Sequence, residues 1–463
     1  MSLHVIILAA GKGSRMKSDI PKVLHKVAGM PMLHRVLSTA KLLAPEQIHL
    51  VLGHGIQAIQ DTLANQWSAA NIVRQAEQLG TGHAVNIALD HVPDDGISLV
   101  LYGDVPLITA ETLEHCVAIA RAGELGIVTA NMSDPARLGR ILRNETDSIE
   151  AIVEHKDATQ QQRAIHEINS GILAAPTHLL RSWLAEVQPS NQQGEYYLTD
   201  VVALAGNDGV SVQGIVVDDA NEVIGVNDRV QLSQVERILQ RRQADELMRQ
   251  GVTLADPERV DIRGTLSCGT DCFIDVNTVF IGDVHLASGV VIGPSVVIES
   301  SQLGAGAQVK ANTVIEGAMI AEGCQLGPFA RIRPGSQFAS GVKIGNFVET
   351  KKTTMGAGSK ASHLAYLGDA VIGMDVNVGA GSVTCNYDGV DKHPTIIGDG
   401  AFVGTNSTLV APLTIGAQSF VAAGSTVTAD VEEHTLALGR VKQRNIARWL
   451  SPLKRKQKKS PEH

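Results

Sequence analysis

Aromatic residues and cysteines are scarce in this chain of 463 residues, and the two shortages argue against an aromatic core and against a disulfide-stabilised fold. Phe, Trp and Tyr make up 3% of the residues, so aliphatic side chains must fill most of the core. The 5 cysteines are an odd number at scattered positions and do not indicate a disulfide framework. Cys268 and Cys272 have no second ligand pair nearby, which argues against zinc. Free thiols in a reducing compartment are the simplest interpretation.

Long apolar runs and a positive net charge are also missing. No run is long enough to cross a membrane, and the apolar stretch 5–10 is too short for a signal peptide. We therefore expect a cytoplasmic protein with no membrane partner. The net charge of −9 argues against general nucleic-acid binding. The exception is a basic tail, expected to be solvated and disordered, that contains Lys454, Arg455, Lys456, Lys458 and Lys459.

A six-residue period is the strongest pattern that is present. Between 397 and 427 an aliphatic residue recurs at every sixth position, often followed by a small one. The same period runs upstream from Ile262, with a slip of one residue at Leu303. It fits neither a helix nor simple alternation, and it is typical of a parallel β-helix with three hexads per coil. Residues 262–433 would then form roughly nine coils and a column ~45 Å tall. An ordinary β-sandwich is the alternative.

The N-terminal half has a different pattern, in which apolar runs alternate with helical segments. This alternation predicts an α/β domain with a mostly parallel sheet and helices on both faces. The expected strands include 4–8, 48–52, 97–101, 126–130 and 168–173. Ligands of such folds bind beyond the C-terminal ends of the strands.

A loop of small residues and cations, residues 9–16, follows the first expected strand. Its Gly and Ala residues let backbone N–H groups approach an anion, and Lys12 and Arg15 add positive charge. It matches neither the P-loop nor the dinucleotide fingerprint, and a simple turn is the alternative. Asp104 follows the strand 97–101 and is either a loop cap or a metal ligand. Beside a phosphate loop we favour a ligand of Mg²⁺, which binds one or two carboxylates plus substrate phosphates.

Several short motifs together resemble those of the nucleotide-sugar pyrophosphorylases. They are Leu8-Ala9-Ala10-Gly11 with Arg15, Pro21-Lys22-Val23-Leu24, Leu79-Gly80-Thr81-Gly82-His83-Ala84, Tyr102-Gly103-Asp104-Val105-Pro106 and Glu154-His155-Lys156-Asp157. With the long hexapeptide region, the chain resembles over about residues 3–450 the bacterial bifunctional N-acetylglucosamine-1-phosphate uridylyltransferase/glucosamine-1-phosphate N-acetyltransferases. The resemblance implies a Rossmann-like uridylyltransferase domain (1–227), a linker helix (228–250), a left-handed β-helix acetyltransferase domain (251–437) and a C-terminal tail (438–463).

For the N-terminal domain the resemblance implies that UTP and N-acetylglucosamine 1-phosphate form UDP-N-acetylglucosamine and pyrophosphate, with Mg²⁺. The implied nucleotide and phosphate contacts are Leu8, Ala9, Ala10, Gly11, Arg15 and Lys22, with Gln75, Gly80 and Thr81 on the uracil. The implied sugar and ribose contacts are Tyr102, Gly103, Gly139, Glu154 and Asn169, and the implied metal ligands are Asp104 and Asn227. Lys22 could instead be merely solvated, and Asn227 could be the N-cap of the following helix. Leu138 stands where the family usually has Tyr.

In the C-terminal half the hexapeptide period is disturbed at 347–371 and 384–394, and sites are expected at irregular segments on a rigid scaffold. The resemblance implies acetyl transfer from acetyl-CoA to glucosamine 1-phosphate. We assign His363 as general base because histidine is the residue type best suited to proton transfer near neutral pH, although a lone His is often structural. The implied substrate contacts are Arg333, Lys351, Tyr366, Asn377 and Lys392. The implied acetyl-CoA contacts are Ala380, Asn386, Tyr387, Thr405, Ala423 and Arg440. Thr405 replaces the family's usual Ser.

The resemblance further implies a homotrimer with acetyltransferase sites shared between chains, supplying UDP-N-acetylglucosamine for cell-envelope polymers. Two alternatives stay open at this point. One is a single-activity nucleotide-sugar pyrophosphorylase, and the other treats the β-helix as a pure trimerisation scaffold. In the helix after Asn227, the charged face formed by Glu236, Arg237, Arg241 and Arg242 is expected to be solvated.

Overall fold

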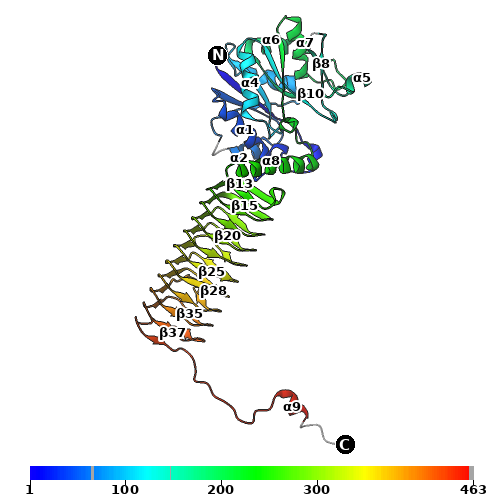
Figure 1. Cartoon of the computed structure of the whole chain (residues 1–463). Helices are drawn as coiled ribbons and strands as arrows, with labels where there is room; N and C mark the ends of the chain where they lie inside the picture. Colours follow the sequence, from blue (N-terminus) through cyan, green and yellow to red (C-terminus); the bar gives the residue numbers. More distant parts are fainter. Residues whose placement is uncertain (64–66, 146, 458–463) are drawn as a thin grey trace, which may run out of the picture. The chain divides into compact units, whose positions relative to one another are not determined.

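The computed structural model describes residues 1–63, 67–145 and 147–457. The chain divides into two compact units, one formed by 1–247 with 260–264 and the other by 248–259 with the chain from 265 onward. Figure 1 shows an α/β arrangement in the first unit and stacked short strands in the second. Among the described residues, none of the helices combines the length and apolarity needed to cross a membrane.

A nine-stranded sheet forms the centre of the first unit, with β11-β7-β10-β6-β1-β4-β5 as its main path. The strands are β1 (Leu3–Ala9), β4 (Gln47–Leu52), β5 (Asn71–Arg74), β6 (Ile97–Tyr102), β7 (Leu125–Asn131), β8 (Arg140–Arg143), β9 (Ile149–Val153), β10 (Glu167–Pro176) and β11 (Val212–Val216), beside a separate pair, β2 (Lys26–Val27) and β3 (Met30–Pro31). β1 pairs in parallel with β4 and β6, whereas β10 runs antiparallel to β6 and β7. The predicted mostly parallel sheet is confirmed, with β10 as an antiparallel member.

Helices cover both faces of this sheet because its central strand is apolar on both sides. Val5 and Ile7 of β1 belong to the core beneath α1 and α4, whereas Ile6 and Leu8 belong to the core beneath α3, α6 and α7. Successive side chains of a strand point to opposite faces, so a continuous apolar run requires cover on both. The helices are α1 (Met32–Leu42), α2 (Ile56–Leu63), α3 (Thr81–Leu89), α4 (Ala110–Arg121), α5 (Gln160–Arg163), α6 (Thr177–Glu186), α7 (Val201–Asn207) and α8 (Arg229–Arg249).

The start of α8 corrects one alternative from the sequence. The side chain of Asp228, not of Asn227, caps the helix, because Asp228 Oδ1 accepts a hydrogen bond from the backbone N–H of Gln231 at 2.9 Å. The side chain of Asn227 is therefore available for other contacts.

The charged face of α8 is also not simply solvated, which corrects a second expectation. Glu236 Oε2 accepts a hydrogen bond from the backbone N–H of Ala28 at 2.6 Å, and Arg242 forms an ion pair with Asp219 at 2.7 Å. Since both partners belong to the first unit, α8 is bound to that unit through its polar side as well as its apolar one.

The second unit is a parallel β-helix with three faces, as the six-residue period predicted. The first face contains β12 (Thr253–Leu254), β14 (Phe273–Ile274), β16 (Val291–Ile292), β19 (Gln308–Val309), β22 (Gln325–Leu326), β25 (Lys343–Asn346), β28 (Lys360–His363), β31 (Asn377–Val378), β34 (Phe402–Val403), β37 (Phe420–Val421) and β39 (Leu436–Ala437). The second contains β17 (Val297–Glu299), β20 (Val314–Glu316), β23 (Arg331–Ile332), β26 (Glu349–Lys351), β29 (Tyr366–Gly368), β32 (Val383–Cys385), β35 (Thr408–Val410) and β38 (Thr426–Val427). The third contains β18 (Gln302–Leu303), β21 (Met319–Ile320), β24 (Gln337–Phe338), β27 (Thr354–Met355), β30 (Ala370–Ile372), β33 (Thr395–Ile397) and β36 (Leu413–Ile415).

Two longer strands open the β-helix. β13 (Val260–Cys268) pairs with β15 (Thr278–Leu286), and β15 pairs with both β17 and β18, so it contributes to two faces. Further along, equivalent residues of successive coils stack in register, as Ile298, Ile315 and Ile332 do. All three side chains are buried, because each aliphatic residue of the period points into the column.

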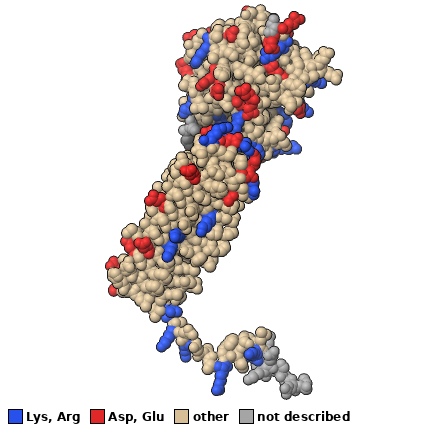
Figure 2. All heavy atoms as spheres, in the orientation of Figure 1, with Lys and Arg blue, Asp and Glu red and all other residues tan. Residues whose placement is uncertain are grey.

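The C-terminal segment differs in part from its predicted disorder. A short helix, α9 (Pro452–Gln457), contains Lys454 and Arg455, whose side chains are exposed as expected. Figure 2 shows Lys and Arg as the only charged residues along the described segment after 438. Lys458 and Lys459 lie outside the described residues, as does the side chain of Lys456.

Candidate active sites

A pocket of about 250 Å³ lies at the C-terminal ends of β1 and β6 in the first unit. This is the edge at which ligands of a parallel sheet are expected. The predicted residues that line it are Leu8, Ala9, Ala10, Gly11, Lys22, Gln75, Gly80, Thr81, Tyr102 and Asp104. Gly103 packs tightly beneath it, since a Cβ there would lie 3.2 Å from Ala9 Cβ. Segments far apart in sequence thus form one cavity.

A polar cluster joins Lys22, Asp104, Asn227 and Arg15. The Lys22 ammonium forms a short ion pair with Asp104 Oδ2 and donates to Asn227 Oδ1 at 3.2 Å. Arg15 Nη2 donates to the same Asn227 oxygen at 2.8 Å. Lys22 is therefore not a merely solvated lysine, and both predicted phosphate-binding cations contact a predicted metal ligand.

Asp104 and Asn227 have the right chemistry for Mg²⁺, because both present oxygen atoms toward one point, where the Lys22 ammonium contacts each of them. Within residues 1–63, 67–145 and 147–457, no group of three or more His, Cys, Asp or Glu side chains could hold a metal. A cation bound to this pair would thus need further ligands from substrate phosphates or water.

The residues predicted to contact the uracil are held by internal hydrogen bonds. Gln75 is 5% exposed, and its Nε2 lies 3.3 Å from Gly80 O and 3.1 Å from His83 Nδ1. Thr81 Oγ1 accepts a hydrogen bond from the backbone N–H of Leu198 at 3.1 Å. The segment before α3 is therefore rigid where it lines the pocket.

Gln78 was missed by the sequence reasoning. Its Nε2 donates to the backbone oxygen of Ala10 at 2.7 Å and so joins the loop 9–16 to the segment before α3. Glu195 also lines the pocket without having been predicted. Gln78 could have been predicted, because it is a polar residue between the predicted site residues Gln75 and Gly80. Nothing in the local sequence indicated Glu195.

Tyr102 forms part of the pocket wall, and its ring fits there only because residue 171 is a glycine. Gly171 has a φ of +86°, and a Cβ at this position would lie 2.5 Å from Tyr102 Cε2. Burial, followed by the carboxylates of Glu154 and Asp104, raises the pKa of Tyr102. The phenol therefore remains neutral and can donate a hydrogen bond at neutral pH.

Gly139, Glu154 and Asn169 form a second group in this unit. The backbone N–H of Asn169 donates to Gly139 O at 2.9 Å, and a Cβ on Gly139 would lie 3.2 Å from Glu154 Oε1. Burial, then the negative charges of Asp157 and Asp200, raises the pKa of Glu154. Beside this group Leu138 offers its backbone oxygen to Arg140, with its own side chain 39% exposed.

In the second unit His363 lies at the end of β28, paired in register with Asn346 of β25. His363 Nδ1 is 2.8 Å from Asn346 Oδ1. An amide oxygen only accepts hydrogen bonds, so Nδ1 carries the proton and Nε2 has a free lone pair. The His363 side chain is exposed, as a general base that meets a substrate must be.

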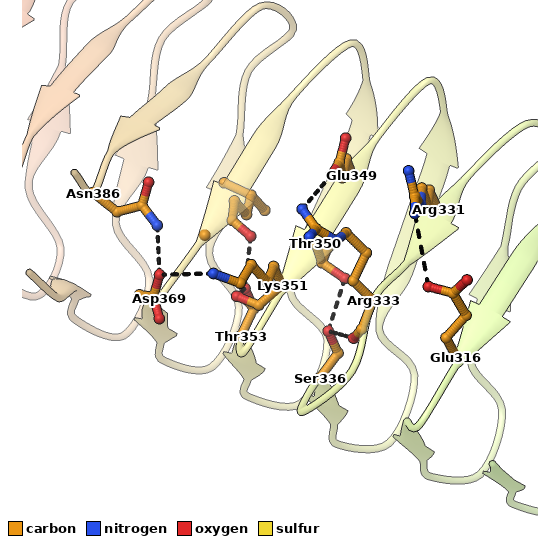
Figure 3. Close-up of polar contacts among 12 residues, drawn as sticks. Glu316, Arg331, Arg333, Ser336, Glu349, Thr350, Lys351, Thr353, Asp369 and Asn386 are labelled. Atoms are coloured by element: carbon orange, nitrogen blue, oxygen red, sulfur yellow. Dashed lines mark hydrogen bonds and ion pairs between the residues drawn. The ribbon is translucent and has the colours of Figure 1, made fainter. Parts of the chain in front are cut away.

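Two cationic residues predicted to bind substrate lie on the second face, Arg333 just after β23 and Lys351 in β26 (Figure 3). Arg333 Nη1 binds Glu349 Oε1 at 2.9 Å. Lys351 Nζ lies 3.9 Å from Asp369 Oδ2, and the same carboxylate accepts a hydrogen bond from Asn386. Together these contacts define a polar patch on one side of the column.

Lys392 approaches this patch from the loop 384–394. The neighbouring Lys351 ammonium lowers the pKa of Lys392, because a second positive charge beside it is disfavoured. Two ammonium groups this close are a favourable binding environment for a doubly charged phosphate. Tyr366 of β29 pairs in register with Glu349, which places it in the same patch.

Buried hydroxyl groups fix the corners from which these side chains project. Ser336 Oγ donates to Arg333 O at 2.8 Å and lies 3.0 Å from Thr350 Oγ1, and Thr353 Oγ1 donates to Leu367 O at 2.7 Å. Figure 3 shows these hydroxyls beneath the charged side chains. Satisfied buried polar groups make the scaffold of the patch rigid.

The predicted acetyl-CoA contacts form a second group. Ala380, Thr405 and Ala423 occur at corners of successive coils: the backbone N–H of Asn406 donates to Ala380 O at 2.7 Å, and that of Gly424 donates to Thr405 O at 2.8 Å. A Cβ on Gly424 would lie 3.9 Å from Arg440 Cδ. The four predicted residues thus follow one edge of the column.

Asn377 and Tyr387 stand apart from that edge. Asn377 pairs in register with Lys360 on the first face, the face of His363. Tyr387 is 60% exposed in the 384–394 loop and forms an isolated antiparallel bridge with Lys392. Among the described residues, no hydrogen bond or ion pair joins Asn377 to the Lys351 patch, and the two lie on different faces of the column.

Asn346, Glu349 and Asp369 were missed by the sequence reasoning. Each contacts a predicted residue: His363, Arg333 and Lys351 respectively. They fall at ordinary positions of the hexapeptide period, and only the stacking of coils 16 to 18 residues apart creates the contacts.

Comparison with known proteins covers both units. Residues 5–195 match the family model of the MobA-like NTP transferase domain. The chain is 54% identical to the bifunctional protein GlmU of Marinobacter nauticus, over 98% of this chain and 99% of that protein. It is 51% identical to the GlmU proteins of Alkalilimnicola ehrlichii and Acinetobacter baumannii, over 97% and 98% of this chain and 97% and 100% of those proteins. The chain therefore belongs to the GlmU family of bifunctional proteins.

Proposed function

We propose that the two units perform consecutive steps in the synthesis of UDP-N-acetylglucosamine, acetyl transfer in the β-helix and then uridylyl transfer in the α/β unit. The chain is a bifunctional transferase, with an NTP transferase domain and full-length relatives that are bifunctional. The observation that carries the proposal is the occurrence of two separate polar sites, one in each unit. Both steps proceed in the cytoplasm in this proposal.

In the first unit the phosphate oxygen of N-acetylglucosamine 1-phosphate attacks the α-phosphorus of UTP, and pyrophosphate leaves. Catalysis of this step consists mainly of positioning and charge neutralisation. The loop 8–11 holds the nucleotide, and Arg15 and Lys22 bind its phosphates. Gln75, Gly80 and Thr81 read the uracil, while Tyr102, Gly103, Gly139, Glu154 and Asn169 contact the sugar and ribose. The convergence of loop 8–11, Lys22, Gln75, Gly80, Thr81 and Tyr102 on one pocket supports this assignment.

Asp104 and Asn227 hold Mg²⁺ in this proposal. When bound, the cation neutralises charge on the phosphates of the reacting nucleotide. The two oxygen ligands are 123 positions apart in sequence (227 minus 104), and the contact of each with Lys22 supports their use as a pair.

In the second unit the amine of glucosamine 1-phosphate attacks the thioester carbonyl of acetyl-CoA. A C–N bond forms, the C–S bond breaks, and the amine proton passes to Nε2 of His363 while CoA leaves as the thiol. The hydrogen bond between His363 Nδ1 and Asn346 supports this role, because it leaves Nε2 free to accept the proton. Arg333, Lys351 and Lys392 bind the sugar phosphate, and Tyr366 and Asn377 orient the sugar.

Acetyl-CoA follows the column edge of Ala380, Thr405, Ala423 and Arg440, with Asn386 and Tyr387 beside it. The position of Asn377 on the first face and of Lys351 on the second supports a homotrimer in which neighbouring chains complete each acetyltransferase site. No nucleic acid or membrane takes part.

A crossed pair of variants tests the proposal on the full chain. Free thiol is followed with glucosamine 1-phosphate and acetyl-CoA, and pyrophosphate is followed separately with N-acetylglucosamine 1-phosphate, UTP and Mg²⁺. His363→Ala should abolish thiol release and leave pyrophosphate release intact, whereas Asp104→Asn should do the reverse. If wild type released pyrophosphate but no thiol, the β-helix would be a scaffold alone and the acetyltransferase half of the proposal would fail.

A further inference from the structure

One side chain occupies the point at which the two proposed metal ligands meet. The Lys22 ammonium contacts Asp104 Oδ2 in a short ion pair and donates to Asn227 Oδ1 at 3.2 Å. The side chains of Lys22 and Asp104 are 15% and 16% exposed, so the pair is largely shielded from water. An ammonium group here neutralises the carboxylate that a divalent cation would otherwise neutralise.

The side-chain amide of Asn227 is oriented so that its oxygen, not its nitrogen, faces the cations. The Nδ2 group of Asn227 donates to Gly225 O at 3.3 Å, which turns Oδ1 toward the cations. That oxygen also accepts from Arg15 at 2.8 Å. Both proposed metal-binding oxygens are thus already bound by cations that belong to the chain itself.

We propose that Lys22 is an exchangeable occupant of the metal position. Without nucleotide, its ammonium stays on Asp104 and Asn227. When metal and triphosphate bind together, the metal takes these oxygens and Lys22 transfers to phosphate oxygens that arrive in the same event. This inference rests on the metal assignment in the proposed function. It adds that the metal binds together with the nucleotide, because the bare ion must compete with the Lys22 ammonium.

Two consequences follow from this competition. A divalent ion alone binds weakly, because it must displace a positive charge that then has no anionic partner. The nucleotide complex of the ion binds without this penalty, because the phosphates provide the displaced lysine with new partners. Removing the lysine should therefore strengthen binding of the bare ion while weakening binding of the nucleotide.

The test measures Mn²⁺ binding to the full-length protein without nucleotide, from the electron paramagnetic resonance signal of free Mn²⁺. Lys22→Met should bind Mn²⁺ at least about fivefold more tightly than wild type, the effect of one unit charge about 4 Å away even in water. Lys22→Gln retains a hydrogen-bond donor for Asp104 and should also bind Mn²⁺ more tightly than wild type. It replaces Lys22→Met in the test if the Met variant does not fold.

Lys12→Met is the matched control. It removes the same charge from the neighbouring loop, and within the described residues Lys12 has no hydrogen bond or ion pair with Asp104 or Asn227. Its Mn²⁺ affinity should stay within about twofold of wild type, since a solvated charge is screened. An equal increase in both variants would overturn the proposal, because general charge removal would then explain the effect. Unchanged or weaker Mn²⁺ binding by the Lys22 variants would overturn it too.

Asp104→Asn separates this inference from the proposed function. If Asp104→Asn abolishes Mn²⁺ binding but the Lys22 variants do not strengthen it, only the exchange is wrong. If Mn²⁺ binding is unaffected by Asp104→Asn, the metal assignment fails and the exchange fails with it. If the metal assignment and the exchange are both correct, Asp104→Asn loses Mn²⁺ binding and the Lys22 variants bind Mn²⁺ more tightly.

Discussion

A buried histidine pair should make the first unit sensitive to mild acid. His4 and His49 are 4% and 1% exposed and lie on neighbouring strands, with His4 Nδ1 3.3 Å from His49 Nε2. Asn71 Nδ2 donates to His49 Nδ1 at 3.1 Å, and Ser2 Oγ lies 3.1 Å from His4 Nε2. Both rings are satisfied as neutral groups, each with its proton on Nε2.

Burial, then the nearby His4 and His91, lowers the pKa of His49 to about 4, against a model-peptide value of 6.5. The folded state therefore keeps His49 neutral where the unfolded chain binds a proton. Its contribution to stability is present above pH 6.5 and is lost as the pH falls toward 4. Linkage gives a loss of about 2 kcal/mol between pH 7 and pH 5, and about 3 kcal/mol by pH 4.

Urea unfolding followed by tryptophan fluorescence measures this loss. Trp67 and Trp183 are buried in the first unit, whereas Trp449 is 58% exposed, so the change in emission reports mainly on that unit. His49→Gln cannot titrate and should reduce the stability lost between pH 7 and pH 5 by about 2 kcal/mol, at a constant cost in stability. A slope as steep in His49→Gln as in wild type would refute the reasoning.

Three further changes test other parts of the structure. Asn346→Ala should lower kcat of acetyl transfer about 10- to 100-fold with little change in KM, because His363 loses the partner that orients it; a proportional rise in KM would contradict this. Gly171→Ala should destabilise the first unit by about 1–3 kcal/mol, since its φ is +86° and its Cβ would clash with Tyr102; an unchanged urea midpoint would argue against it. Phe280→Ala, at a fully buried ring, should cost about 3–5 kcal/mol in β-helix stability by circular dichroism, whereas a loss below 1 kcal/mol would indicate an unneeded side chain.

The sequence by itself determined the two architectures, because their signals are local. A six-residue period is enough to predict the β-helix, since each hexad forms one short strand and one corner without reference to the rest of the chain. Apolar runs between helical segments were enough for the α/β unit, and small-residue loops at strand ends located its pocket. The resemblance to known enzymes supplied the reaction and the residue roles, which periodicity alone could not supply.

Tertiary structure decided which charges meet. Lys22 contacts Asp104 across 82 positions and Asn227 across 205, and only the folding of the whole unit brings these three residues together. The sequence offered Asn227 as a possible helix cap, but in the structure Asp228 caps α8 and Asn227 Oδ1 accepts a hydrogen bond from Arg15. Asn346 and Asp369 became partners of His363 and Lys351 only because coils stack in register. Periodicity specifies where a side chain points, but a contact between distant residues depends on the packing of the whole fold.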